Sequence, residues 1–432
     1  MLSIPMIAEM VMESLFAIVD IYFVSKVGVN AVAAVALTES VLMIVYSIAI
    51  GLSMAVTAIV ARRVGERKKK RASDAAFQGI LMGLGVGVLL GSTGYFLAED
   101  VLLIMGGEPG VIAEGKRYTE LMFLSNVSII LLFLINGIFR GAGDASIAMR
   151  SLWLANGINI VLDPILIFGL GPVPAMGIEG AAIATIIGRT SGVIYQLYFL
   201  VNGRSVLLFS WKNLVIRLQT IREILRISVA GMGQFLVESA SWIFLVRVMS
   251  GFGAEALAGY TIAFRVIVFT ILPSWGMANA AATLVGQNLG AGSPERAERS
   301  VWRTARWNMV FLGSISVVFY LFSLPILMFF SEDDAVLQVG ASALKIICLG
   351  YVFFAYGMVI SQAFNGAGDT RTPLVINVGV FWLLQIPLAY LMAVAWNWQA
   401  EGVFISIALC HSLHALICIW LFRRGRWKLI KV

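Results

Sequence analysis

The sequence predicts an all-α integral membrane protein, with twelve transmembrane helices in two six-helix bundles related by pseudo-two-fold symmetry along the membrane normal. Three observations lead to this fold class. Hydrophobic residues make up 60% of the 432 positions and charged residues only 13%, with a mean hydropathy of +0.91, whereas soluble domains are about 45–50% apolar. Apolar runs of spanning length recur along the chain. The two halves of the chain also share an internal repeat.

Each predicted span is a run of about 18 or more mostly apolar residues, bounded by charged, Gly or Pro residues. The approximate ranges are 2–26, 33–60, 75–98, 118–139, 146–169, 178–201, 224–250, 257–285, 302–330, 338–365, 372–396 and 401–423. They divide the chain into an N-terminal bundle over 1–202, a cytoplasmic linker over 203–223 and a C-terminal bundle over 224–432.

The two halves align at a constant offset of 225 residues. Gly28 matches Gly253, and the clearest match joins F-R-G-A-G-D at 139–144 with F-N-G-A-G-D at 364–369. G-A-G-D is a turn sequence, so we expect the aspartates at its end, Asp144 and Asp369, to end one helix and cap the next. Because six helices is an even number, both halves have the same orientation, which is the parallel type of repeat with a cavity between the halves.

The cations of the connections predict the orientation of the chain in the membrane. Lys and Arg gather at 61–73, 140–150, 204–222, 296–306 and 423–431, whereas acids gather at 99–114, 255 and 332–334. Both termini are therefore predicted to be cytoplasmic. The net charge of +7 needs no nucleic-acid partner. The hydrophobic start continues too far for a cleavable signal peptide, and its abruptness suggests that a short cytoplasmic leader precedes it.

The first span carries Glu9, Glu13 and Asp20 in an otherwise apolar run. A charged side chain at bilayer depth costs at least about 2.5–3.5 kcal/mol, so such residues usually face a protein interior or an aqueous cavity and serve transport. Glu9 and Glu13 are one helical turn apart, and Glu13 and Asp20 are two, so all three share one face. Glu9 lies near the chain start and the cytoplasmic interface, and we expect it to be solvated.

A second polar pair lies on the fifth span. Asn159 and Asp163 are four residues apart and share a helix face, and Pro164 interrupts backbone hydrogen bonding beside the acid. Thr185 on the sixth span adds a hydroxyl. Carboxylate, amide and hydroxyl oxygens of this kind can share either a proton or a Na⁺ ion. The alternative for Asn159 and Asp163 is a structural interhelical hydrogen bond.

Several motifs together resemble the multidrug and toxic compound extrusion (MATE) family of transporters. They are the spacing from Pro5 to Asp20, V-D-I-Y-F-V-x-x-x-G at 19–28, F-x-G-A-G-D in both halves, and N-x-x-x-D-P at 159–164. Their order and spacing match over essentially the whole chain. The resemblance implies an exporter, not an enzyme, that works by alternating access. It would exchange inward-moving H⁺ or Na⁺ for an outgoing amphipathic and often cationic compound.

The resemblance also implies functional residues. Asp20, Asn159, Asp163 and Thr185 match the family's amino-terminal cation site, and Pro5 sits where the first helix of the family bends. The internal repeat places a second acid, Glu238, at the position that corresponds to Glu13. Glu238 is therefore a candidate cation-binding residue of the second lobe. The repeat partner of Asp20 is Leu245, so the carboxylates are denser in the N-terminal bundle. Asp20 is a stronger candidate for the coupling site than Glu13.

Soft and aromatic side chains suit a cavity for varied drugs. Candidates are Met54, Phe133, Phe264, Trp275, Met277, Tyr351, Phe354 and Met358. His411 and His414 share a face of the last span, but no ligand set accompanies them, so packing is favoured over a metal site or proton relay. We expect a monomer in the bilayer of a bacterial or archaeal inner membrane, with small drugs as partners and no cofactor besides the coupling ion.

Two other functions remain open. A flippase for lipid-linked saccharides shares the two-bundle design, but its central cavity would be expected to be more basic, whereas only three arginines lie clearly within spans here. A membrane hydrolase using His411 and His414 would need a nucleophile or metal near them. Because the same oxygens suit both ions, the sequence leaves the choice between H⁺ and Na⁺ coupling open.

Overall fold

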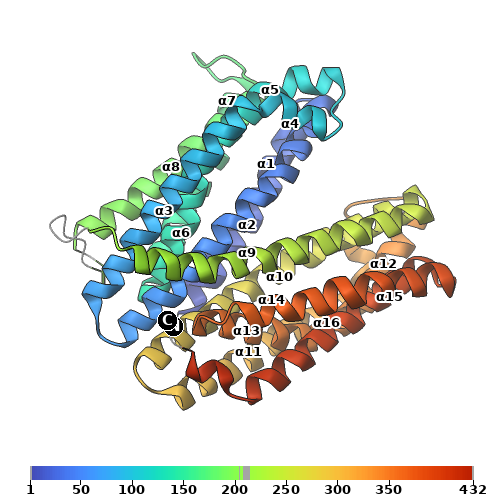
Figure 1. Cartoon of the computed structure of the whole chain (residues 1–432). Coiled ribbons are helices and arrows are strands. Elements are labelled where there is room, and N and C mark those ends of the chain that lie inside the picture. Colours follow the sequence, from blue (N-terminus) through green and yellow to red (C-terminus); the bar gives the residue numbers. More distant parts are fainter. Residues whose placement is uncertain (1, 204, 208–214, 431–432) are drawn as a thin grey trace. The chain divides into compact units, whose positions relative to one another are not determined.

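The computed structural model describes residues 2–203, 205–207 and 215–430 of the chain (Figure 1). Apart from one isolated bridge between Leu170 and Val173, all regular structure in these residues is helical. The predicted linker at 203–223 lies partly outside the described residues, since positions 204 and 208–214 are not among them.

The first half of the chain forms eight helices within the described residues. α5 and α6 bend by 41° at the break between them and together form one candidate span. The helices are α1 (Ser3–Ser25), α2 (Val29–Gly65), α3 (Lys69–Phe96), α4 (Ala98–Ile104), α5 (Pro109–Leu124), α6 (Asn126–Ala142), α7 (Ala145–Phe168) and α8 (Ile178–Val201).

The second half repeats this plan. α12 and α13 bend by 58° and form one candidate span, as α5 and α6 do. The elements are α9 (Leu218–Met249), η2 (Ser250–Phe252), α10 (Ala254–Gly290), α11 (Pro294–Leu327), α12 (Asp334–Leu349), α13 (Tyr351–Ala367), α14 (Arg371–Asn377), η3 (Val378–Gln385), α15 (Ile386–Tyr390), η4 (Leu391–Ala395), α16 (Gln399–Arg423) and η5 (Arg426–Leu429). The run from α14 to η4 forms a single span, in which η3 and η4 are π-helical.

Eight helices of the described chain are long and apolar enough to cross a membrane, or ten if each bent pair counts as one span. α1 and α8 correspond to the two remaining predicted spans. α1 falls outside the count of apolar helices because every stretch of spanning length in it contains Glu9, Glu13 and Asp20.

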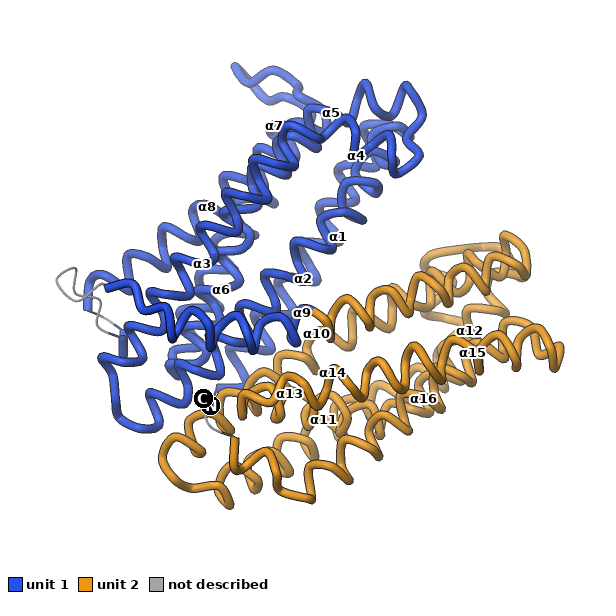
Figure 2. Tube along the Cα trace, in the orientation of Figure 1, with its two compact units in different colours: residues 1–232 blue, residues 233–432 orange. Residues whose placement is uncertain are grey.

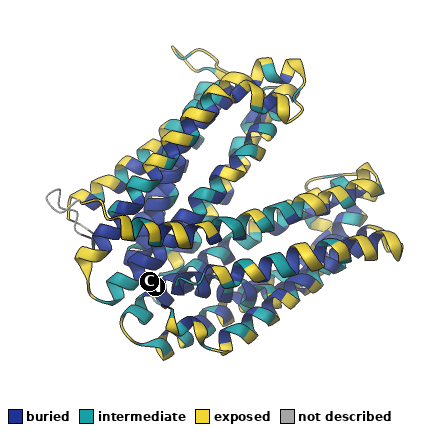
Figure 3. Ribbon diagram, in the orientation of Figure 1, coloured by how far each residue is buried: buried dark blue, intermediate teal, exposed yellow. Residues whose placement is uncertain are grey.

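The chain divides into two compact units, Met1–Met232 and Gly233–Val432, with the boundary inside α9 (Figure 2). In each unit, buried positions line the packed faces of the helices and exposed ones line their outer faces (Figure 3). In the first unit, α2 packs on α6 and α7 packs on α8, and α1 packs on α7. These contacts place the acids of α1 beside the polar face of α7.

The repeated F-x-G-A-G-D motif closes one helix of each unit in the same way. Gly143 follows α6 with φ +93° and Gly368 follows α13 with φ +87°, where a Cβ would be strained. In each copy the Asp N–H donates to the carbonyl of the Phe five residues earlier, at 2.8 Å in the first unit and 2.9 Å in the second. This is the bond of a Schellman cap, so the motif encodes a helix end.

The two aspartates of the motif then differ. Asp369 accepts hydrogen bonds from the N–H of Thr372 at 3.2 Å and from its hydroxyl at 2.7 Å, so it caps the start of α14 as predicted. Asp144 accepts instead from the Ser205 hydroxyl at 3.0 Å and the Val206 N–H at 3.1 Å. The prediction that Asp144 caps α7 is wrong, because its side chain makes no capping bond there and holds the connector after α8 instead.

Candidate functional site

The polar face of α7 forms the centre of the candidate site. Asn156, Asn159 and Asp163 are each at most 2% exposed, and their spacing places them along one side of the helix. The Asn159 side-chain NH₂ donates to the hydroxyl of Thr185 at 3.1 Å. Among the described residues, neither carboxylate oxygen of Asp163 nor the amide oxygen of Asn159 has a hydrogen-bond partner. Buried oxygens without partners are costly, so this group is suited to receive a proton or a cation.

Close packing of α8 on α7 brings Thr185 to Asn159. A Cβ on Gly188 would collide with the carbonyl oxygen of Ala155 and lie 3.2 Å from the Cβ of Asn159. Small residues allow transmembrane helices to approach in this way. Pro164 has no N–H to donate to the carbonyl four residues earlier. One backbone carbonyl near Asp163 therefore lacks its usual hydrogen bond within the helix.

α1 adds its carboxylates to this face. Glu13 accepts a hydrogen bond from the Asn156 NH₂ at 3.0 Å. Asp20 is half-buried and lies close enough to Asp163 for their charges to interact. Of the five residues that the sequence names for the first-lobe site, the structure joins Asn159 and Thr185 by a hydrogen bond and places Asp20 within electrostatic reach of Asp163. Glu13 joins the same face of α7 through Asn156.

A buried arginine stands beside these acids. Arg189 is 4% exposed, and its guanidinium carbon lies 5.7 Å from the ring centre of Phe16 and 6.0 Å from that of Tyr46. Its charge interacts with those of Glu13, Asp20 and Glu39, although its Nε and one terminal nitrogen have no hydrogen-bond partner among the described residues. Sequence alone does not show which charges Arg189 and Glu39 interact with, because those charges lie on other helices.

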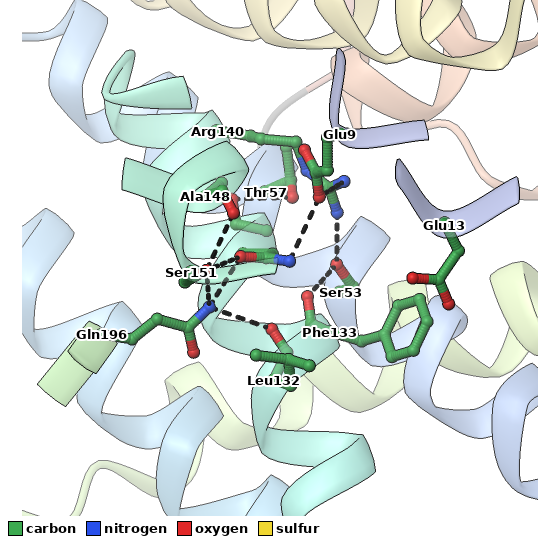
Figure 4. Close-up of polar contacts among 12 residues, drawn as sticks. Glu9, Glu13, Ser53, Thr57, Leu132, Phe133, Arg140, Ala148, Ser151 and Gln196 are labelled. Atoms are coloured by element: carbon green, nitrogen blue, oxygen red, sulfur yellow. Dashed lines mark hydrogen bonds and ion pairs between the residues drawn. The ribbon is translucent and has the colours of Figure 1, made fainter. Parts of the chain in front are cut away.

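Glu9 is not solvated, contrary to the sequence-based expectation. It is 1% exposed, and its Oε1 accepts from the Arg140 guanidinium at 3.2 Å and from the Asn136 NH₂ at 3.1 Å (Figure 4). Arg140 also donates to the Ser53 hydroxyl at 3.2 Å. The expectation is wrong because two side chains of α6, Arg140 and Asn136, reach Glu9 and supply both a counter-charge and hydrogen-bond donors.

The network around Glu9 continues to α7 and α8. The Asn136 carbonyl oxygen accepts from the Ser151 hydroxyl at 3.0 Å and from the Gln196 NH₂ at 2.6 Å (Figure 4). The indole N–H of Trp153 donates to the carbonyl of Ala8 at 3.0 Å. Residues 8–13 of α1 thus accept hydrogen bonds from the neighbouring helices, whereas Asp20 receives no hydrogen bond among the described residues.

The second unit contains a neutral counterpart of the Glu9–Arg140 pair. At the 225-residue offset, Glu9 corresponds to Gln234 and Arg140 to Asn365. Gln234 and Asn365 exchange two hydrogen bonds of 3.0 and 3.2 Å. Both residues are buried. The repeat therefore preserves this contact between the two helices, and only the first unit makes it with charges.

The remaining predicted residues lie in varied surroundings. Pro5 is the third residue of α1, a position whose N–H an α-helix leaves unpaired in any case. Glu238 is half-buried on α9 and has no hydrogen bond or ion pair among the described residues. The first unit holds Met54 and Phe133, both half-buried. Phe133 packs edge-on against Tyr46.

Of the cavity candidates in the second unit, Phe264, Tyr351 and Phe354 belong to an aromatic cluster. Phe264 packs on Trp242 with ring centres 4.5 Å apart, and Phe354 lies 4.8 Å from the ring of His411. Tyr351 and Met277 are buried, and Trp275 and Met358 are half-buried. His414 hydrogen-bonds to Asn377 at 3.1 Å, which agrees with its interpretation as a packed histidine.

Sequence reasoning missed several polar residues of the first unit. Asn156 could have been found, because it shares the 3–4-residue spacing of Asn159 and Asp163 on α7. Asn136, Ser151 and Gln196 carry no comparable signal. Each is a single polar residue in an apolar span, and its partner is on another helix.

We expect Arg189 and Glu39 to be energetically coupled. Arg189→Gln removes the cation that faces three carboxylates, so it should lower the melting temperature in detergent, and Glu39→Gln combined with it should restore part of the loss. The coupling energy from the double-mutant cycle should be about 1–3 kcal/mol. Arg226→Gln, at an exposed arginine of α9, is the control. Strictly additive effects of the two substitutions would contradict this coupling.

Comparisons with known proteins match both halves of the chain. A sequence model of the MatE family matches residues 5–165 and 231–391. The chain is 27% identical over 430 residues to the probable multidrug resistance protein NorM of Thermotoga maritima, covering 99% of this chain and 92% of that protein. It is 24% identical over 409 residues to an FAD transporter of Shewanella oneidensis, covering 95% and 90%.

A solved structure extends this likeness to three dimensions. It is the outward-facing conformation of a multidrug resistance MATE family transporter, with a TM-score of 0.93, 27% identity, and coverage of 99% of this chain and 96% of that one. The predicted fold class, with twelve transmembrane helices in two six-helix bundles, is thereby confirmed. The paired matches of one family model also agree with the internal repeat.

Proposed function

The chain belongs to the MatE family of membrane transporters, and on this premise we propose that it is a multidrug exporter driven by cation antiport. The family resemblance that the sequence motifs predict is confirmed, and the protein is a transporter and not an enzyme. The proposal covers the finer points: small amphipathic, often cationic compounds as substrates, H⁺ or Na⁺ as the coupling ion, and alternating access as the mechanism.

One observation carries the proposal of cation coupling. Asp163 and Asn159 present three buried oxygen atoms without partners, beside the hydroxyl of Thr185 and within the electrostatic reach of Asp20. Oxygen atoms are the ligands that hard cations prefer, and a carboxylate kept from water favours uptake of a proton or cation. We propose that Asp20, Asn159, Asp163 and Thr185 take up the ion, with Glu13 as a neighbouring contributor.

The packing of α1 would couple ion uptake to drug release. Residues 8–13 of this helix accept hydrogen bonds from α6 and α7, through the carboxylates of Glu9 and Glu13 and the carbonyl of Ala8. The part of α1 that carries Asp20 makes no such hydrogen bond to another helix among the described residues. We propose that ion uptake by Asp20 and Asp163 changes how this part packs on α7 and α8 and so lowers the affinity for drug. Pro5, the hinge that the family resemblance implies, lies on the other side of residues 8–13 and has no part in this step. By linkage, drug must then weaken ion binding by the same factor.

The remaining site and placement proposals follow the family assignment. Glu238 is a candidate ion site of the second unit, and the soft and aromatic candidates in both bundles would line the drug cavity. The domain limits proposed are 1–202, 203–223 and 224–432. The protein would be a monomeric multi-pass protein of the cytoplasmic membrane, in contact with the lipid bilayer, with both termini in the cytoplasm.

Inverted vesicles containing the protein test the proposal. Ethidium transport is measured under an imposed pH gradient and, separately, under a Na⁺ gradient. We expect one of these gradients to drive transport at several times the rate of vesicles without the protein, which also identifies the coupling ion. If neither gradient drives ethidium transport, cation antiport of drugs is wrong.

The alternative function, flipping of lipid-linked saccharides, is tested in the same vesicles. Translocation of a fluorescent lipid-linked saccharide without ethidium transport would favour it. FAD serves as a further probe, since one relative is an FAD transporter. Transport of FAD alone would place the substrate among dinucleotides and not among amphipathic drugs.

A further inference from the structure

The start of α11 presents a stripe of arginines on one helix face. Arg296, Arg299, Arg303 and Arg306 are all exposed. Their spacings of three, four and three residues place them within an arc of about 80° on an α-helix. The stripe occupies roughly three turns of the helix end.

The same face continues into apolar residues. Val310, Val317 and Leu321 follow the stripe at helical spacing, and their exposed fractions are 52%, 58% and 65%. They lie within a helix that is apolar enough to span the membrane. Trp307, which is 66% exposed, stands where the charged part meets the apolar part, as Trp does at membrane interfaces. This order of exposed charged, aromatic and aliphatic residues is the one expected of a lipid-facing helix surface whose arginines would lie at the level of the headgroups.

The arginines of this stripe lack acidic partners in the part of the chain that the structure describes. No ion pair there includes any of the four. Glu298 is on the same helix but pairs with Lys428. Glu295, one turn before Arg299, is the one acid of α11 beside the stripe. Arginines three and four residues apart repel one another, so an anion on this face would relieve an existing cost.

The equivalent helix of the first unit uses this face differently. At the 225-residue offset, Arg299 and Arg303 correspond to Asp74 and Gln78 of α3. Asp74 pairs with Arg217 at 3.1 Å. Gln78 donates to the carbonyl of Val215 at 2.8 Å and accepts from the N–H of Arg217 at 3.3 Å. The connector thus covers the face in the first unit, whereas in the second unit no described residue covers it and its arginines are exposed.

We propose that the arginine stripe of α11 is a binding site for the headgroups of anionic phospholipids. The phosphate oxygens accept hydrogen bonds from guanidinium groups, often two at a time, while the acyl chains lie along the exposed aliphatic face below. Basic residues next to a transmembrane helix attract anionic lipid in this way. The site lies on the outer side of the second unit and makes no use of the residues proposed to bind the coupling ion.

Native mass spectrometry of the full-length protein in detergent tests this site with two probes, phosphatidylglycerol and phosphatidylcholine. We expect the wild-type protein to retain phosphatidylglycerol in preference. The variant R299Q/R303Q/R306Q should bind phosphatidylglycerol at least about tenfold more weakly, with its binding of phosphatidylcholine unchanged. R299K/R303K/R306K should retain most of the preference because it keeps the charge.

The matched control is K69Q/K70Q/R71Q, which removes three cations from the corresponding end of α3 and should leave the preference intact. Equal retention of both lipids by the wild-type protein, or an equal loss in the control, would overturn the proposal. Should the triple glutamine variant fail to fold by gel filtration, Arg303→Gln alone gives the test, with an expected loss of a few-fold, and an unchanged affinity would count against the site.

Discussion

Asp20→Asn is expected to abolish cation-driven ethidium transport while the protein still inserts and folds. Asp20 is the one carboxylate of α1 that no described residue holds by a hydrogen bond, and its charge interacts with that of Asp163 on the neighbouring helix α7. The amide has nearly the same shape but cannot take up a proton or balance a cation. The gradient-driven rate in inverted vesicles should fall at least about tenfold.

Asp163→Asn should give a loss of the same size, and the double variant should be no worse than either single variant, because residues that act as a unit are not additive. Glu120→Gln, at a carboxylate that pairs with Arg117 on α5, is the control. Full transport by Asp20→Asn at the wild-type rate would remove Asp20 from the coupling site and leave Asp163 to act alone.

Arg140→Asn is expected to destabilise the first unit strongly. Arg140 and Glu9 are both buried and lie 3.2 Å apart, and removing one partner of a buried ion pair costs about 3–5 kcal/mol because the other charge is left uncompensated. We expect a clear fall in the melting temperature in detergent, or in the yield of monodisperse protein.

The internal repeat supplies the replacement that tests this explanation. E9Q/R140N introduces the neutral pair that the second unit already uses at Gln234 and Asn365. It should recover most of the stability lost by Arg140→Asn, although the hydrogen bond to Ser53 is not restored. If the double variant is as unstable as Arg140→Asn, the lost packing of the arginine and not the orphaned charge of Glu9 explains the effect.

The same double variant also separates stability from coupling. Glu9 and Arg140 fasten the first part of α1, which is distinct from the part that carries Asp20. A folded E9Q/R140N protein should therefore still transport ethidium under the gradient that drives the wild-type protein. A complete loss of transport in a stable double variant would place the charges of this pair within the coupling mechanism.

Much of the fold could be read from the sequence because it depends on local patterns. The length of the apolar runs predicts the membrane spans, and the internal repeat at an offset of 225 residues predicts the two bundles. The G-A-G-D turn marks a helix end, which both units close with a left-handed glycine. The shared face of Glu9, Glu13 and Asp20 follows from helical periodicity alone. None of these inferences requires knowledge of which helices are neighbours.

The partners of those residues depend on the neighbours, and only the tertiary structure decided them. Periodicity places Glu9 on a polar face, but its partner Arg140 lies 131 residues away on a helix whose packing no local pattern reports. For the same reason the sequence did not show which charges Arg189 and Glu39 face, and it assigned Asp144 to a cap although that residue binds the connector. A helix face is a property of one segment, whereas the charge that compensates a buried acid is a property of the packing between segments.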